Sequence, residues 1–549
     1  MEQTRFFLAI ALSFLVFLLW ELIVVEKKDT TNIKQAIEQT EKIEQSDPEV
    51  PYLTQEEKDA LLKDSISSTE PLKASRIITI ETPMYAVNLS EKGGVIKSFV
   101  LKKYKENISK DSLNKELIPP EIQEIGTFKV YFENNPKIMD EIFFADTEES
   151  QFKITEKPLE LTLKWQSQSG LVIEKQFSFY PDTYLIDFKL TIKNGTDKAI
   201  KDNLVISLIN KAPPKVASYT FDGPSFLINS DVKQINLDKL NKNNPASGDI
   251  KWVSFGDRYF MTSVIPLASA ESSVKIIKEE NIVETKYFKS IGILRADTMQ
   301  QLNFKLYFGP KKLSMLKKVG YNIDESIDFG MFGFLAIPCL WIMNFIYTVI
   351  PNYGIAIILL TILIKLIFWP LGTKSYKSMN EMKKIQPLLT QIREKYKDDK
   401  QKVQMEMMNL YKVYKINPLG GCLPMLVQIP VFFAFYRMLY ESIELRHAYF
   451  FGWINDLSAP DRLFNFGFTI PFMEPPYGIP VLTVIMGATM LLQQQLSPPP
   501  GDPMQAKMMM LLPIIFTVIF INFPAGLVLY WLVNNIISIA QQYYTTKNA

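Results

Sequence analysis

Residues 355–369 read Ile-Ala-Ile-Ile-Leu-Leu-Thr-Ile-Leu-Ile-Lys-Leu-Ile-Phe-Trp, an apolar run interrupted only by Thr361 and Lys365. A charge inside such a run is costly in lipid, so it usually faces a wet cavity or another polar group. Thr361 and Lys365 are four residues apart and share one face of a helix, which favours a polar stripe. The other interpretation is that Lys365, roughly 6 Å from the Trp369 end at ~1.5 Å per residue, extends to the membrane surface.

Five more apolar runs predict, together with this one, six membrane-spanning helices. Residues 6–25 are almost entirely apolar and long enough to cross a ~30 Å hydrocarbon core. A cleaved signal peptide is disfavoured, because its apolar core is usually ~7–15 residues and no A-x-A-like site follows. The other four runs are residues 423–439, 479–492, 508–523 and 527–540. We therefore expect an N-terminal anchor at 1–25 and a five-helix core at 353–543.

A further apolar run at 331–350 contains Pro338 and is followed by Pro351. We interpret it as an amphipathic helix that lies on the membrane, within residues 329–352, and not as a seventh span.

Loop charges predict the orientation. Residues 374–417 carry eleven Lys or Arg and five Asp or Glu, whereas residues 441–477 carry two Arg and five acids. The positive-inside rule places the first loop in the cytoplasm and the second outside. Six spans then place both termini, including the short tail 544–549, in the cytoplasm and residues 26–330 outside.

The outer region has two parts. Residues 26–72 are rich in Glu, Lys, Gln, Ser and Thr and are typical of a flexible tether. Over residues 73–328 the pattern changes to apolar residues at every second position, with turn signals between the runs. This alternation predicts a large all-β, antiparallel sandwich. Examples of the alternation are residues 76–81, 127–132, 159–165 and 185–192.

The composition excludes several kinds of site. The chain has 549 residues, a net charge of +2, one histidine (His447) and two cysteines (Cys339 and Cys422). This excludes a disulfide framework and a Cys-rich metal site, and it argues against nucleic-acid binding. No cofactor, metal or nucleotide-binding loop is predicted. The sandwich has no histidine and no paired-carboxylate motif, so a scaffold or docking domain is favoured, with a carbohydrate-active enzyme that uses residues such as Trp252 as the alternative.

The cytoplasmic loop 374–417 is predicted to form a helical hairpin. Apolar residues recur at helical spacing in two stripes separated by a charged turn. The stripes are Met382, Ile385, Leu389, Ile392 and Tyr396, and then Val403, Met407, Leu410 and Tyr414. The outer face is basic, with Lys383, Lys384, Arg393 and Lys400 as candidate docking residues. Solvent, anionic lipid, or a ribosome or targeting factor are alternative partners for this face.

More polar residues occur at membrane depth, namely Gln428, Asn534 and Asn535. They either line the same polar path as Lys365 or form hydrogen bonds between neighbouring helices.

Several segments of the C-terminal half resemble the YidC/Oxa family of membrane insertases. The segment 411–430 contains Asn-Pro-Leu-Gly-Gly-Cys-Leu-Pro-Met, and 523–530 reads Phe-Pro-Ala-Gly-Leu-Val-Leu-Tyr. Residues 444–446, 453–458 and 502–505 fit the same signature in order and spacing. One span, a large outer domain and five further spans are similar to the Gram-negative type of this family, whose outer domain is a β-supersandwich.

The resemblance implies a protein of the bacterial inner membrane that inserts and helps fold other membrane proteins, alone or with the Sec translocon. Its core would enclose a hydrophilic groove open to the cytoplasm and to lipid. The implied partners are nascent membrane proteins, Sec components, membrane lipids, and a ribosome or signal-recognition receptor. An insertase of this kind needs neither covalent catalysis nor nucleotide hydrolysis. A channel or transporter that uses the polar stripe is the alternative, although no repeat relates the two halves.

The resemblance also implies roles for single residues. Lys365 takes the position of the groove cation, which is usually Arg in this family. Lysine keeps the charge but loses the planar five-donor fork. Trp531 takes the position of a substrate-contacting aromatic that is usually Tyr, and Tyr530 precedes it. With Thr361, Gln428 and Asn534, these residues form the predicted groove.

Overall fold

The computed structural model describes residues 75–213, 221–240, 245–268, 271–414, 423–496 and 503–547. The predicted anchor and tether, at 1–25 and 26–72, lie outside these residues. The chain divides into two compact units between Ile327 and Asp328. The N-terminal unit is β-rich and the C-terminal unit is helical, as the sequence predicts.

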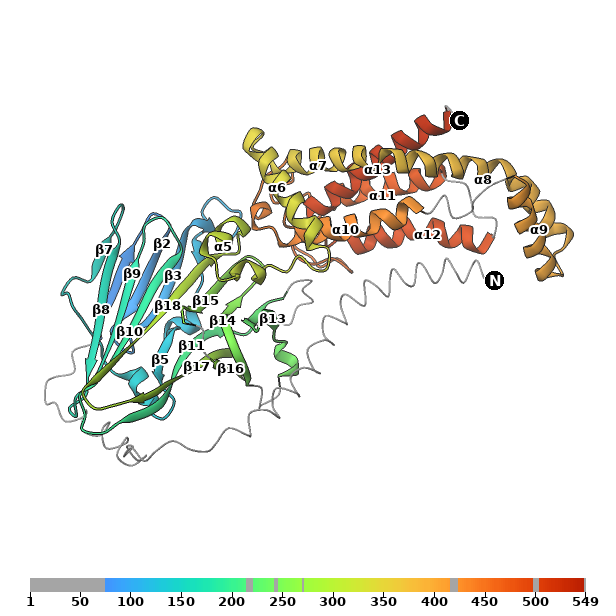
Figure 1. Cartoon of the computed structure of the whole chain (residues 1–549). Helices are drawn as coiled ribbons and strands as arrows, with labels where there is room; N and C mark the ends of the chain where they lie inside the picture. Colours follow the sequence, from blue (N-terminus) through green and yellow to red (C-terminus); the bar gives the residue numbers. More distant parts are fainter. Residues whose placement is uncertain are drawn as a thin grey trace. The chain divides into compact units, whose positions relative to one another are not determined.

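The β-rich unit contains two sheets (Figure 1). The five-stranded sheet has the order β4 (Asn114–Glu116), β3 (Val95–Lys105), β2 (Tyr85–Ser90), β1 (Ile77–Glu81) and β7 (Gln151–Lys153). The 13-stranded sheet follows the order β5 (Lys129–Phe132), β11 (Ile200–Lys211), β17 (Ile282–Leu294), β16 (Glu271–Glu279), β14 (Ala246–Gly256), β15 (Phe260–Pro266), β18 (Thr298–Pro310), β10 (Leu185–Asn194), β9 (Leu171–Phe179), β8 (Leu159–Gln166) and β6 (Phe144–Ala145). The strands β12 (Gly223–Ile228) and β13 (Asp231–Gln234) pair beside β14.

Short helical segments join some of these strands. They are α4 (Pro120–Gln123), η3 (Pro136–Asp140), η4 (Leu237–Lys239), α5 (Leu313–Val319) and η5 (Ile323–Ser326). Strand pairs are antiparallel apart from β1 with β7. The four runs of alternating residues quoted above coincide with β1, β5, β8 and β10 to within two residues at each end, so the period-two pattern correctly predicts these strands.

Aromatic side chains fill the space between the two sheets. Phe99 of β3 lies 5.3 Å from Phe308 of β18 and 4.7 Å from Tyr85 of β2, measured between ring centroids. Phe177 of β9 and Phe188 of β10 lie 4.9 Å apart. All five rings are almost completely buried. This core therefore holds the domain together by packing, as expected from the absence of cysteines.

One lysine lies inside this core. Lys175 of β9 is completely buried, and its Nζ donates to the carbonyl oxygens of Gly93 (2.6 Å) and Val130 (3.3 Å). The same nitrogen lies 4.2 Å from the centroid of the Phe143 ring. Burial lowers the pKa of Lys175 from 10.5 to about 7. Because Gly93 lies in the turn between β2 and β3, Lys175 ties the two sheets together.

The C-terminal unit is built from helices. They are α6 (Gly333–Val349), α7 (Tyr353–Ile367), α8 (Trp369–Lys395), α9 (Lys400–Val413), α10 (Leu423–Glu441), η6 (Ile443–Leu445), α11 (Val481–Leu496), α12 (Pro503–Phe520) and α13 (Ala525–Lys547). The helix α13 packs against α7, α8, α10 and α11 (Figure 1). It is the central element of the unit.

Helix length and composition support a membrane span in one place. Among the described residues no single helix is both long and apolar enough to cross a membrane. Together, α7 and α8 are long and apolar enough to cross a membrane, although they are bent by 65° at Phe368. The expected number of six spans therefore remains a prediction.

A helix is present where the membrane-surface helix was expected. Ala336, Leu340 and Met343 form the buried face of α6. Its opposite face carries the exposed side chains of Trp341 and Phe345. The helix therefore exposes apolar side chains opposite its buried face, and its amphipathic character stays a prediction. Its location at the membrane surface stays a prediction.

Candidate functional site

Lys365 is buried, and it points toward α13. Its residue surface is only 6% exposed, and its Nζ donates to Ser538 Oγ at 2.8 Å. Ser538 Oγ in turn donates to the carbonyl oxygen of Asn534 at 2.6 Å. The Tyr376 hydroxyl of α8 lies near Ser538 as well. Within the described residues no carboxylate lies within ion-pair distance of Lys365, so the cation is held by neutral groups alone.

The bend between α7 and α8 contributes further polar contacts. Gln541 Nε2 donates to the carbonyl oxygen of Trp369 at 2.8 Å and to Thr373 Oγ1 at 3.2 Å. The same Trp369 carbonyl also accepts a hydrogen bond from Thr373 Oγ1 at 3.0 Å. We refer to Lys365, Thr373, Tyr376, Ser538 and Gln541 as the Lys365 cluster.

The cluster extends along one side of α13. Asn535, Ser538, Gln542 and Thr545 are buried polar residues spaced by three, four and three positions, which places them on one helix face. Asn535 Nδ2 donates to Thr489 Oγ1 of α11 at 3.2 Å. Gln542 Oε1 is buried, and no hydrogen-bond partner for it occurs among the described residues. The sequence interpretation missed Ser538 and Gln541, although this spacing could have revealed the stripe.

Lys365 and Ser538 lie at the same level of the helical unit. Lys365 is twelve residues from the start of α7 at Tyr353, and Ser538 is thirteen residues from the start of α13 at Ala525. At ~1.5 Å per residue these are depths of about 18 and 20 Å. The polar cluster therefore lies far from the helix ends where α7 and α13 begin.

Those helix ends are joined by the segment 442–480. The backbone N–H groups of Ala525 and Gly526 donate to the carbonyl oxygens of Ala459 (2.8 Å) and Leu457 (2.9 Å). Asn352, before α7, donates through Nδ2 to the Phe450 carbonyl at 3.0 Å. These bonds close this end of the unit around α7 and α13.

The start of α11 is fixed by the same segment. The buried Asp461 accepts from the backbone N–H of Leu482 at 2.7 Å and from Thr483 Oγ1 at 3.0 Å. A carboxylate that accepts two hydrogen bonds at a helix N-terminus is stabilised by both the bonds and the helix dipole.

An aromatic cluster lies beside α13 toward this closed end. Trp531 is half-buried, with its ring 4.8 Å from Phe432 of α10 and 5.0 Å from Phe520 of α12. Tyr530 is buried and stacks on Phe435 at 4.6 Å. Tyr530 and Trp531 share Phe432 as a ring neighbour but differ in burial. Trp531 is positioned between α10 and α12, whereas Tyr530 belongs to the packed interior.

The other predicted residues of this region are placed as follows. Thr361 is buried, and its hydroxyl donates to the Ile357 carbonyl of its own helix at 2.7 Å. Asn534 is half-buried and supplies the carbonyl that Ser538 contacts. Gln428 is half-buried on α10. Part of the signature segment 411–430, including residues 415–422, lies outside the described residues.

The hairpin predicted for the cytoplasmic loop is formed by α8 and α9. Its core contains Ile385, Leu389, Met407 and Tyr411, with Met382, Ile392, Val403 and Leu410 packed around them. Tyr414 was expected in this core, but it is exposed. The reason is that α9 ends at Val413, so Tyr414 lies past the helix and Tyr411 occupies the core position.

The candidate docking residues of the hairpin differ in exposure. Lys383 and Lys384 are exposed on α8, whereas Arg393 is half-buried with Nη1 unpaired. The side chain of Lys400 lies outside the described part of the chain. Among the candidate docking residues, Lys383 and Lys384 are therefore the two that the structure shows with exposed side chains.

Comparison with known proteins identifies the family. Residues 77–342 match the family model described as the YidC periplasmic domain, and residues 345–549 match the model described as 60Kd inner membrane protein. The membrane protein insertase YidC of Syntrophus aciditrophicus is 40% identical over 480 residues, which cover 86% of this chain and 85% of the relative. The chain belongs to the YidC family of membrane protein insertases.

Other relatives agree with this assignment. The YidC insertase of Syntrophobacter fumaroxidans is 38% identical over 481 residues, 86% of each chain. That of Nitratidesulfovibrio vulgaris is 35% identical over 566 residues and covers all of both chains. A crystal structure titled as an active YidC insertase covers 88% of this chain and 97% of its own, with a TM-score of 0.36 and 19% identity. A TM-score this low does not by itself establish a shared fold.

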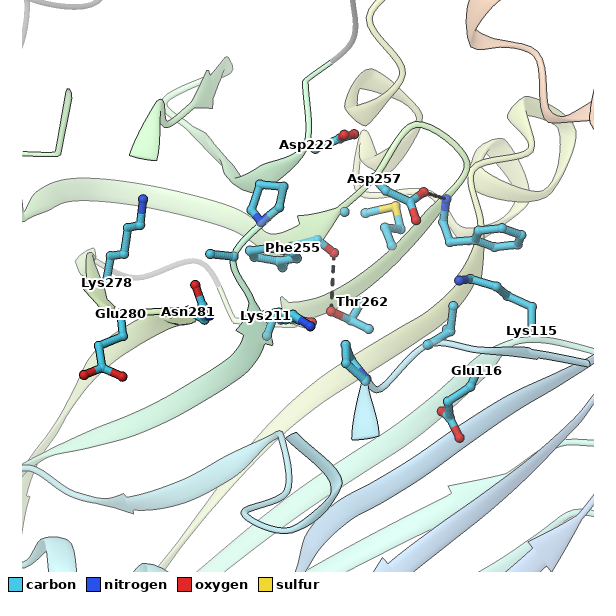
Figure 2. Close-up of a pocket in the computed structure, with 18 residues that line it drawn as sticks. Lys115, Glu116, Lys211, Asp222, Phe255, Asp257, Thr262, Lys278, Glu280 and Asn281 are labelled. Carbon is cyan, nitrogen blue, oxygen red and sulfur yellow. Dashed lines mark hydrogen bonds between the residues drawn. The ribbon is translucent and has the colours of Figure 1, made fainter. Parts of the chain in front are cut away.

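The β-rich unit is thus the periplasmic domain of an inner-membrane YidC protein, and it contains a cavity of about 720 Å³. Figure 2 shows Lys115 and Glu116 on one side and Lys278 and Glu280 on the other. Thr262 Oγ1, which also lines the cavity, donates to the Phe255 carbonyl at 3.3 Å. The volume falls within the ~300–1,000 Å³ range of small-molecule sites.

The charges of this cavity are largely neutralised. Lys115 pairs with Glu106 at 3.1 Å, and Lys211 pairs with Glu121. In the described part of the chain, one buried oxygen of Asp222 (Oδ1) has no hydrogen-bond partner, and burial raises the pKa of this carboxyl group. A polar atom of this kind is a candidate ligand contact. Asp257 also lines the cavity, but its Oδ1 accepts the backbone N–H groups of Tyr259 and Phe260 at 2.7 Å each.

Among the described residues of this domain, we find no arrangement of side chains that would support an enzymatic role. No group of three His, Cys, Asp or Glu side chains that could hold a metal ion occurs among the described residues. Trp252, considered as a sugar-stacking residue, is completely buried, and its Nε1 donates to the Asn322 carbonyl at 3.2 Å. Trp252 is therefore a packed core residue of the YidC periplasmic domain.

Proposed function

We propose that this YidC protein inserts its substrates through a hydrated groove lined by the Lys365 cluster and open to the cytoplasm. The supporting observation is that Lys365 is buried at 6% exposure and donates to Ser538, with no carboxylate within ion-pair distance among the described residues. A buried charge without a counter-ion is unfavourable. An acidic side chain in the translocated tail of a substrate would remove this imbalance, because it supplies the missing counter-charge.

Insertion in this mechanism depends on solvation. A hydrated groove shortens the hydrocarbon barrier that a polar tail has to cross, since polar groups lose their hydrogen bonds to water in lipid. Lys365 stabilises an acidic tail during this passage. The apolar helix of the substrate then partitions into lipid. Partitioning and the membrane potential supply the free energy, without covalent catalysis or nucleotide hydrolysis.

The lysine at this position changes how the tail is recognised. An ammonium group is a compact charge with three donors, and here one hydrogen bond is directed to Ser538. A guanidinium could bind a carboxylate through two parallel hydrogen bonds. We therefore expect attraction by charge with little geometric selection among acidic tails.

The substrate helix would pass along α10 and α12. Trp531 supports this path, because its ring contacts Phe432 of α10 and Phe520 of α12 and remains half-exposed. A large aromatic ring offers apolar contact area to many different helices. The indole N–H of Trp531 replaces the hydroxyl that a tyrosine would offer.

The membrane arrangement belongs to the same proposal. Six spans place both termini and the α8–α9 hairpin in the cytoplasm and the β-rich unit in the periplasm, as the loop charges predict. The bonds that join segment 442–480 to α7 and α13 would then close the periplasmic end. That closure argues against a continuous channel.

The partners are proposed from the family and from the exposed basic surface. Nascent membrane proteins are the substrates, inserted alone or with the Sec translocon, and the protein also acts as a chaperone for their folding. Lys383 and Lys384 of the hairpin would contact a ribosome, a signal-recognition receptor or anionic lipid.

A rescue experiment tests the proposed function. The full chain is expressed in cells depleted of their own insertase, and membrane insertion of a small phage coat protein is followed by protease accessibility. We expect rescue by the wild type and by Lys365→Arg, which preserves the charge. Failure of the wild type to restore insertion, at normal membrane abundance, would contradict the proposal.

A further inference from the structure

The connection between α10 and α11 contains an uncharged aromatic loop. Residues 463–473 read Leu-Phe-Asn-Phe-Gly-Phe-Thr-Ile-Pro-Phe-Met, without a single charged side chain. Phe464, Phe468 and Phe472 are 68%, 65% and 82% exposed. Exposed apolar groups gathered in this way mark a surface that binds a partner or a membrane. Neither the groove nor the hairpin accounts for them.

The loop is held in place at its base. Leu463 and Ile479 exchange two backbone hydrogen bonds of 2.9 Å, and Phe466 N–H donates to the Tyr477 carbonyl at 2.7 Å. The rings of Phe466 and Phe468 stack with centroids 5.4 Å apart. The phenylalanines are therefore presented by a folded hairpin-like loop, so little conformational freedom remains to be lost on binding.

Two polar residues tie this loop to the end of α12. Arg462 Nη1 donates to the Ile521 carbonyl at 2.8 Å, and its Nε donates to the Pro476 carbonyl at 2.9 Å. Asn522 Nδ2 donates to the Phe472 carbonyl at 3.0 Å. The loop thus lies at the end of α12, beside the start of α11.

The helices next to the loop expose apolar side chains as well. Val484 and Ile485 of α11, and Ile515 and Ile519 of α12, are all exposed. In a membrane protein such side chains face lipid. The apolar surface of both helices therefore continues into the aromatic loop, and its charged neighbours, Arg462 and Glu474, are at the base.

We propose that residues 463–473 form an interfacial anchor that places Phe464, Phe468 and Phe472 in the outer leaflet of the membrane. Phenylalanine is among the apolar residues that interfacial segments bury at the boundary between headgroups and acyl chains. An uncharged loop avoids the penalty of burying a charge there. The inference rests on the membrane placement of α11 and α12 given under the proposed function. The anchor holds the closed end of the unit at a fixed depth.

Spin labelling of the full chain tests this inference. In a background of Cys339→Ser and Cys422→Ser, single variants Phe464→Cys, Phe468→Cys and Phe472→Cys are labelled with a nitroxide. The protein is reconstituted in vesicles of phosphatidylethanolamine and phosphatidylglycerol. Collisions with oxygen, which concentrates in lipid, are compared with collisions with a water-soluble nickel chelate. Only variants that still rescue insertion are measured.

The anchor predicts that oxygen collisions exceed nickel collisions at all three positions. Ile515→Cys serves as the lipid reference on α12, and Glu474→Cys as the water reference. Nickel collisions in excess at the three positions, with Ile515→Cys still in lipid, would overturn the anchor alone. Protection from both reagents would overturn it too, because a protein surface would then cover the loop. A water-exposed Ile515→Cys would overturn the membrane placement and the anchor with it.

Discussion

The buried Lys175 makes the stability of the periplasmic domain depend on pH. Its pKa falls from 10.5 to about 7 on folding, because burial disfavours the charged form. Below about pH 7 the lysine is charged in both the folded and the unfolded state, and the folded state bears the full penalty. Between pH 7 and 10.5 the unfolded state binds more protons, so the free energy of unfolding rises with pH.

The size of this effect follows from the shift in pKa. Each pKa unit corresponds to ~1.36 kcal/mol, so the full penalty is about 5 kcal/mol. Titration begins near pH 7, and the part released between pH 7 and 9 is about 2 kcal/mol. The variant Lys175→Met has a side chain of similar length and no charge. We expect its free energy of unfolding not to show this rise with pH. The loss of the hydrogen bonds to Gly93 and Val130 changes the stability by the same amount at both pH values, so it does not affect the comparison.

The assay is urea unfolding of residues 75–327 at pH 7 and pH 9, once circular dichroism shows that this unit folds alone. Between pH 7 and pH 9 the free energy of unfolding should rise by about 2 kcal/mol more in the wild type than in Lys175→Met. Lys193→Met, an exposed position on the neighbouring strand β10, is the matched control and should behave as the wild type. Equal pH dependence of the wild type and Lys175→Met would refute the reasoning.

Three further predictions concern the helical unit. Ser538→Ala removes the hydrogen-bond acceptor of the buried cation but keeps its charge, so insertion of acid-tailed substrates should fall partially in the rescue assay; unchanged insertion would show that this contact does not matter. Tyr411→Ala should destabilise the α8–α9 hairpin by about 3 kcal/mol, seen as faster hydrogen exchange in α8, whereas Tyr414→Ala should have no effect. Equal exchange in both variants would contradict this core. Charge reversal at Lys383 and Lys384 should weaken co-sedimentation with ribosomes, most clearly at low salt, and unaltered binding would exclude these residues as the dock.

Local patterns predicted a large part of the fold. Alternation of apolar residues located strands such as β8 and β10, because one face of each is buried and the other is not. The order of the strands in the 13-stranded sheet does not follow the chain, and no local pattern contains that information. Lys175 occupies an inward position of β9, so its burial follows from alternation although lysine is usually exposed.

Only part of the candidate site could be predicted from the sequence. Lys365 stands out because it is a charge inside an apolar run. Its contact with Ser538 was not foreseen, since the neighbour of α7 is decided by tertiary packing. Helix ends were the other weak point, as Tyr414 shows by lying just past α9.

The most direct test of the central claim is a double-mutant cycle between Lys365 and the substrate. Insertion of one acid-tailed substrate, and of the same substrate with every tail Asp changed to Asn, is measured in cells that depend on the wild type or on Lys365→Ala. If Lys365 attracts the tail charge, Lys365→Ala should slow the acidic substrate and leave the Asn version nearly unaffected. An equal loss for both substrates, or no loss for either, would contradict the account.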